Sequence, residues 1–122
     1  MSTEETRADR KDRYERVLGA VHHNTGEVQH PGCRPYEIRL ILCAHANYPV
    51  EGINKAIRAA VENDDLYRWT DATGKERLTR ATKDDLRGVA EYWAAHGDQQ
   101  RLEAVNQAIE QVRADTGLPG DR

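Results

Sequence analysis

The residue types that bind zinc or react as thiolates are concentrated between positions 22 and 45. They are His22, His23, His30, Cys33, Cys43 and His45. The spacing from Cys33 to Cys43 and His45 matches no paired Cys-x-x-Cys knuckle. Cys43 also falls in an apolar stretch, where a thiol usually acts as a small hydrophobic side chain. The pattern therefore favours reduced thiols and no bound metal, with a redox or metal sensor built on Cys33 and Cys43 as an alternative.

Paired carboxylates, which could do acid–base chemistry, occur at Asp64-Asp65 and Asp84-Asp85. The first pair follows a predicted helix and the second lies in the first turn of another, where aspartates cap helix ends and interact with the helix dipole. The chain has no glycine-rich phosphate loop, nucleophile elbow or recognisable Cys/His pair. We expect no enzyme, no catalytic residues and no cofactor.

Composition limits the classes of protein that remain. The chain has 122 residues, of which 38% are hydrophobic and 32% charged, and a formal net charge of -3. These values fit one domain and exclude a strongly basic nucleic-acid coat. The longest apolar run, Leu40 to Ala44, is far too short to span a membrane, and the polar start lacks a signal-peptide core. We expect a cytoplasmic protein.

Hydrophobic periodicity predicts three helices in the first half of the chain. The first covers residues 9–23, with Tyr14, Val17, Leu18 and Val21 on one face. A very short strand at 27–29 and a loop at 30–34 follow. Pro35 begins a mostly buried helix to Ala44, and Pro49 begins an amphipathic helix to Asn63. On this last helix Ile53, Ile57 and Val61 face inward, while Lys55 and Arg58 face outward.

A β-hairpin follows, with strands at 66–70 and 75–79 around the turn Asp71-Ala72-Thr73-Gly74. A type I turn with a left-handed glycine would pair Arg68 with Leu78 and place Leu66 on the same face. The opposite face would carry Tyr67, Trp69, Arg77 and Thr79. For Trp69, packing on the next helix is favoured over stacking on a base.

Two helices complete the chain. Thr82 and Asp85 form a capping box before the stripe Leu86, Val89, Ala90, Trp93 and Ala94, which ends at His96-Gly97. Asp98 then caps a helix over 98–115 with apolar residues at Leu102, Val105, Ile109 and Val112. This helix either forms a homodimer or completes the core of the monomer against the helices at 9–23 and 82–96.

The order of these elements resembles a winged helix-turn-helix domain. Residues 35–44 and 49–63 correspond to the two helices of the motif, and residues 63–79 correspond to the wing. The predicted fold is thus α+β and mainly helical: a flexible start (1–8), a winged helix-turn-helix with its β-hairpin wing (9–80), two additional C-terminal helices (81–116) and a flexible tail (117–122).

The resemblance implies binding to double-stranded DNA, with helix 49–63 in the major groove and the hairpin on the flanking backbone. Arg and Asn side chains match the edges of guanine and adenine, and cations of the wing can meet phosphates. The candidate DNA-binding residues are Asn54, Lys55, Arg58, Arg68, Lys75, Arg77 and Arg80.

Two observations leave other functions open. Residues 34–80 carry eight cations against seven anions, and the spacings from Glu51 to Lys55 and from Arg58 to Glu62 suit ordinary ion pairs on a solvated helix. The expected function is that of a small prokaryotic transcriptional regulator. A homodimer through helix 98–115 is one option for its oligomeric state. The alternative is a winged-helix module that binds another protein and not DNA.

Overall fold

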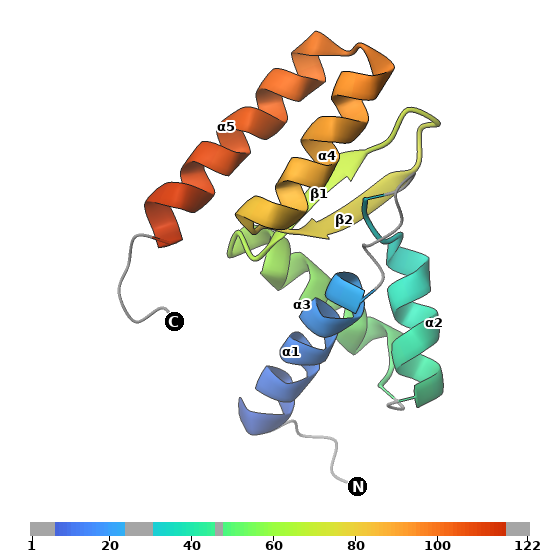
Figure 1. Cartoon of the computed structure of the whole chain (residues 1–122). Coiled ribbons are helices and arrows are strands. Elements are labelled where there is room, and N and C mark those ends of the chain that lie inside the picture. The colour runs from blue at the N-terminus through green and yellow to red at the C-terminus, as the bar shows by residue number, and fades with distance from the viewer. Residues whose placement is uncertain (1–6, 24–30, 46–47, 117–122) are drawn as a thin grey trace, which may run out of the picture.

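The chain forms three helices, a two-stranded antiparallel hairpin and two further helices (Figure 1). A computed structural model describes residues 7–23, 31–45 and 48–116. The elements are α1 (Arg7–His23), α2 (Pro35–His45), α3 (Val50–Glu62), β1 (Leu66–Thr70), β2 (Glu76–Arg80), α4 (Lys83–His96) and α5 (Gln99–Thr116). The predicted fold class, α+β and mainly helical, is confirmed. None of the described helices is long and apolar enough to cross a membrane.

The predicted helix ends agree closely with the structure. The Thr82 hydroxyl accepts a hydrogen bond from the Asp85 amide at 3.3 Å, and Gly97 ends α4 in the left-handed conformation with φ of 71°. The Asp98 carboxylate accepts from the Arg101 amide at 3.1 Å, as expected of a cap for α5. Helix α1 begins at Arg7, slightly before the expected Asp9. The strand predicted at 27–29 lies outside the described residues.

A first hydrophobic cluster lies between α1, α2, α3 and one face of the hairpin. Helix α3 buries Ile53 and Ile57, with Val61 half-buried beside them. This arrangement confirms the face predicted from the sequence. Leu66 and Leu78 extend the cluster onto the hairpin, so the hairpin face that carries these leucines closes the three-helix core.

A second cluster covers the other face of the hairpin. It joins Trp69 to Val89 and Trp93 of α4 and to Val105 of α5. The ring centroid of Trp69 lies 5.8 Å from that of Trp93 in an edge-on arrangement. The expected packing of Trp69 on α4 is confirmed, and Figure 1 shows the hairpin lying between the three N-terminal helices and the α4–α5 pair.

The register of the hairpin is the predicted one, with Arg68 opposite Leu78 and Tyr67 opposite Thr79. Gly74 has φ of 87°, the left-handed conformation expected at the end of the turn. Because Trp69 and Arg77 are also opposite each other, the predicted face of four side chains is present and is directed at α4 and the second cluster.

The segment before α2 is not the plain loop that the sequence suggested. Cys33 forms an isolated antiparallel bridge with Leu78, with both backbone hydrogen bonds at 2.8 Å. At Gly32 a Cβ atom would lie 2.8 Å from the Thr79 hydroxyl and 3.1 Å from the Leu78 carbonyl oxygen. The segment therefore runs directly along the outer edge of β2, and only glycine fits at this close approach.

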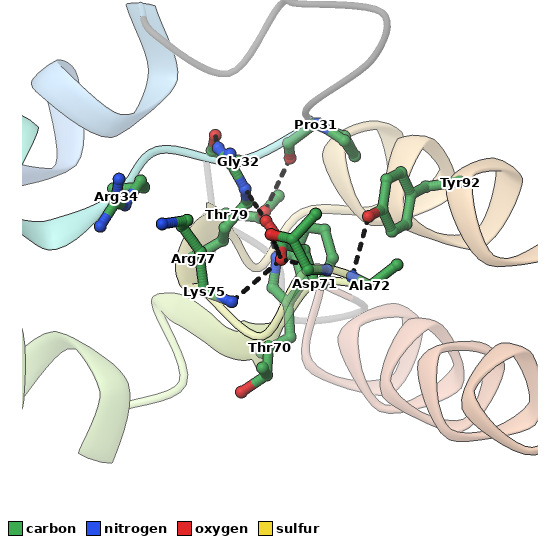
Figure 2. A network of polar contacts seen from close by, with 12 residues as sticks. Pro31, Gly32, Arg34, Thr70, Asp71, Ala72, Lys75, Arg77, Thr79 and Tyr92 are labelled. Atoms are coloured by element: carbon green, nitrogen blue, oxygen red, sulfur yellow. Dashed lines mark hydrogen bonds and ion pairs between the residues drawn. The ribbon is translucent and has the colours of Figure 1, made fainter. Parts of the chain in front are cut away.

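A buried ion pair joins the hairpin turn to this segment (Figure 2). Arg77 Nε donates to Asp71 Oδ2 at 2.6 Å, and Arg77 Nη1 donates to the Gly32 carbonyl at 2.9 Å. The other carboxylate oxygen of Asp71 accepts from the amides of Thr73 and Lys75 and from the Thr73 hydroxyl. One acidic side chain thus holds the turn, the second strand and the segment before α2.

The protonation of Asp71 follows from these contacts. Burial raises the pKa of this carboxyl, but the hydrogen bonds from Thr73, Arg77 and Lys75 outweigh burial and bring the pKa well below its ordinary value of 3.8. Since the folded-state pKa is the lower one, the ionised carboxylate stabilises the fold at neutral pH. This contribution is complete above about pH 5 and is lost as the pH falls below the ordinary value.

We therefore expect Asp71→Asn to lower the free energy of unfolding by about 3 kcal/mol or more at neutral pH, because Arg77 loses its buried partner. The difference from the wild type should shrink between about pH 5 and about pH 3. Urea denaturation across this range measures it, with Asp84→Asn as the control because the Asp84 side chain is 89% exposed. A difference that stays the same in acid would show that the effect comes from packing and not from charge.

Candidate nucleic-acid interface

The outer face of α3 carries the first group of predicted site residues. Lys55 and Arg58 are exposed, on the side opposite the buried Ile53 and Ile57. Asn54 is half-buried, and its side-chain oxygen accepts a hydrogen bond from Arg39 Nη1 of α2 at 3.3 Å. Arg39 was not among the predicted site residues, and the sequence signal for it is weak because it lies within an apolar run.

The ion pairs expected from helical spacing do not form. Among the residues that the structure describes, no salt bridge joins Glu51 to Lys55 or Arg58 to Glu62. The acids are still near in sequence and weaken the local positive potential. The two cations on α3 are nonetheless available to an external anion without first breaking a salt bridge.

The hairpin contributes two exposed cations. Arg68 lies on the leucine face, beyond the edge of the first cluster, with its side chain 54% exposed and its Nη1 atom 3.7 Å from Glu76 Oε2. Lys75 follows the turn and is exposed. Its backbone amide is bound to Asp71, which fixes the point from which the ammonium group extends.

Arg77 and Arg80, the other two predicted cations of the hairpin, are less exposed to solvent than Arg68 and Lys75. The Arg77 side chain is only 10% exposed and both of its described contacts are internal, to Asp71 and Gly32. Arg80 is half-buried, and its Nε atom is enclosed with no hydrogen-bond partner in the described part of the chain. The hairpin face that carries Arg77 packs against α4, so this side chain supports the structure and does not extend toward a phosphate.

The arrangement of elements leaves the α3 face open. Helices α4 and α5 pack on each other and on the aromatic face of the hairpin, whereas α3 lies on the opposite side of the hairpin (Figure 1). No family model, curated protein or solved structure matches the chain. The order of three helices followed by an antiparallel hairpin is consistent with a winged-helix topology.

The hairpin is anchored at its tip. The Tyr92 hydroxyl of α4 accepts a hydrogen bond from the Ala72 amide in the turn at 2.9 Å (Figure 2). With Asp71 bound to Arg77 on the other side of the turn, the tip is tied to two parts of the protein. Any surface that the hairpin presents is therefore held in place before a partner arrives.

Three large apolar side chains on α2 and α3 are exposed to solvent. Tyr36, Leu40 and Val50 are the large hydrophobic residues exposed among the described positions, and the Leu40 exposure is 64%. The interpretation of α2 as mostly buried is wrong for this residue, because the helix packs on α1 and α3 through Ile38 and Leu42. The four-residue spacing of Tyr36 and Leu40 places both on one face and could have indicated it.

The predicted thiols are in different environments. Cys33 is fully buried, and burial together with the nearby Glu37 carboxylate raises its pKa to about 12. Because the thiolate is the reactive form, this argues against a redox sensor that uses Cys33. Cys43 is half-buried and donates to the Tyr48 carbonyl. Within the described ranges, no three His, Cys, Asp or Glu side chains gather around a possible metal ion.

These placements predict that substitutions of two arginines change the free energy of unfolding by very different amounts. Arg58→Ala should change the free energy of unfolding by no more than about 0.5 kcal/mol, since an exposed helix position loses no packing. Arg77→Met should lower it by about 3 kcal/mol, because it leaves the Asp71 carboxylate buried without its partner. Urea denaturation of both variants measures the contrast. A large loss for Arg58→Ala would mean that this side chain is not free.

Proposed function

We propose that this chain binds double-stranded DNA, with the outer face of α3 in the major groove and the exposed cations of the hairpin on the phosphate backbone. The observation that carries the proposal is the state of Lys55 and Arg58. Both are exposed on one helix face and take part in none of the salt bridges of the described residues, and α4 and α5 pack on the aromatic face of the hairpin, away from α3. An exposed cationic helix on a three-helix core is the element that winged-helix proteins place in the groove.

The residues divide into two roles. Arg58, Lys55 and Asn54 are assigned to base edges, where a guanidinium can pair with guanine and an amide with adenine. Arg39 positions Asn54 through their hydrogen bond. Arg68 and Lys75 are assigned to phosphates. Arg77 and Arg80 are left out of the interface, because the first is committed to Asp71 and the second is enclosed at Nε.

A small number of phosphate contacts implies modest affinity. With few cations at the interface, counterion release is limited and non-specific binding depends on low salt. Two copies on neighbouring half-sites would raise the affinity through effective concentration. Helix α5 already buries Val105 and Val112 against α4 within one copy, so dimer formation through α5 would have to use its remaining surface. A role in transcriptional regulation is proposed on the basis of this DNA contact alone.

Fluorescence anisotropy with random duplex DNA at about 50 mM and about 200 mM salt tests the proposal. We expect saturable binding that weakens strongly at the higher salt. Lys75→Ala should reduce the affinity for all sequences and lower the salt slope by about one. Arg58→Ala should reduce the preference for duplexes selected from a random pool by about tenfold, which is the value of one good base contact.

The matched control is Arg87→Ala. Arg87 is 57% exposed on α4, on the covered side of the hairpin, so its removal changes the net charge by the same amount without touching the proposed interface. An equal loss from Arg87→Ala would show that only the overall charge matters. Absence of binding even at the lower salt would contradict the proposal.

The second candidate function is docking to another protein. The exposed Tyr36, Leu40 and Val50 favour it, because large apolar side chains left in solvent, two of them on one face of α2, often mark protein contacts. The anisotropy experiment separates the two functions. A chain that ignores duplex DNA at low salt but stays folded would be a winged-helix interaction module.

A further inference from the structure

A groove lies between β1 and α5, and Arg68 in its lining also belongs to the proposed DNA interface. Its volume is about 290 Å³, close to the lower end of the range for small-molecule sites. The lining consists of Tyr67, Arg68, Trp69, Thr70, Trp93, Arg101, Ala104 and Val105. Residues of β1 and α5, together with Trp93 of α4, thus form the lining, and most of its apolar members belong to the second cluster or pack against it.

One part of the lining is apolar and rigid. Trp69, Trp93 and Val105 are all less than a tenth exposed and pack together in the second cluster. The narrow edges of the two tryptophan rings that remain exposed are held by the packing behind them, so this wall does not depend on the ordering of flexible side chains. A surface of this kind accepts a flat or branched apolar group.

The charged part of the lining is entirely positive. Arg68 and Arg101 are the charged residues among those that line the groove, and no acid is in the lining. The nearest acids stand outside it, with Glu76 3.7 Å from Arg68 and Asp98 3.5 Å from Arg101. They reduce the positive potential, but both guanidinium groups keep donors that face solvent, since each side chain is more than half exposed.

Arg101 is already positioned. Its guanidinium lies 5.0 Å from the centroid of the Trp93 ring, and its Nη1 atom donates to the Thr70 carbonyl at 3.3 Å. This second contact occupies an acceptor on the open edge of β1 and obstructs a peptide strand that would pair there. The groove is therefore suited to a small ligand and not to an added strand.

We propose that this groove binds a small amphipathic carboxylate, with the carboxylate on Arg101 and the apolar body against the exposed edges of Trp69 and Trp93. The planar fork of arginine matches a carboxylate with two parallel hydrogen bonds. The apolar wall disfavours a fully hydrated inorganic anion, which would gain nothing from it. This binding does not depend on DNA, so its test stands apart from that of the proposed function.

The chain itself supplies the signal for the test. It contains two tryptophans, and both line the groove. Phenylacetate titrated into the full chain should give a saturable change in tryptophan fluorescence. Phenylacetamide has the same shape without the charge, and acetate has the charge without the ring. We expect each to bind at least about tenfold more weakly than phenylacetate, because each lacks one of the two complementary parts.

Variants separate the site from general effects. Arg101→Met should weaken phenylacetate at least about tenfold while leaving the affinity for phenylacetamide nearly unchanged, a difference that misfolding cannot produce. Arg87→Met, outside the groove, should have no effect. Equal affinities for the acid and the amide, wild-type affinity in Arg101→Met, or a fluorescence change that never saturates would each overturn the proposal.

Discussion

The structure depends on the burial of the hairpin on both of its faces. A two-stranded hairpin alone is only marginally stable in water, so its strands need an apolar surface on each side or a strong turn. Here Leu66 and Leu78 close the three-helix core, while Trp69 packs on α4 and α5. The buried pair of Asp71 and Arg77 fixes the turn between these surfaces and ties it to Gly32. Two clusters that share no helix are joined into one structure through this hairpin.

This arrangement also determines which surfaces are left for function. The C-terminal helices use the aromatic face of the hairpin, so they lie away from α3 and leave Lys55 and Arg58 in solvent. The same packing fixes the tip of the wing through Tyr92 and forms the groove between β1 and α5. Because one face of the hairpin packs on α4 and α5, only its other face and the turn around Lys75 are available to a partner. The proposed DNA interface is correspondingly small.

Much of the fold could be predicted because local signals agree with one another. The caps at Thr82 and Asp98, the glycine turn and the inward face of α3 all follow from spacing and backbone preference. The hydrogen bonds of Arg77 could not be predicted from local signals, because they involve the Gly32 carbonyl, which is distant in sequence, as well as Asp71. The predicted register nevertheless sets Arg77 on the same hairpin face as Trp69, and the expected packing of Trp69 on the next helix implies that this arginine is covered as well. Leu40 shows the opposite failure, since an apolar run alone does not tell which of its members faces the core.

The two cysteines are buried to different degrees by the same fold. Cys33 is sealed beneath β2 by its backbone bridge to Leu78, whereas Cys43 is only half-buried on α2. A thiol-modifying reagent should therefore react faster with the half-buried Cys43 than with Cys33, which it can reach only after β2 and the segment before α2 have separated. The rate at which Cys33 becomes modified thus reports the rate at which the backbone bridge between Cys33 and Leu78 opens.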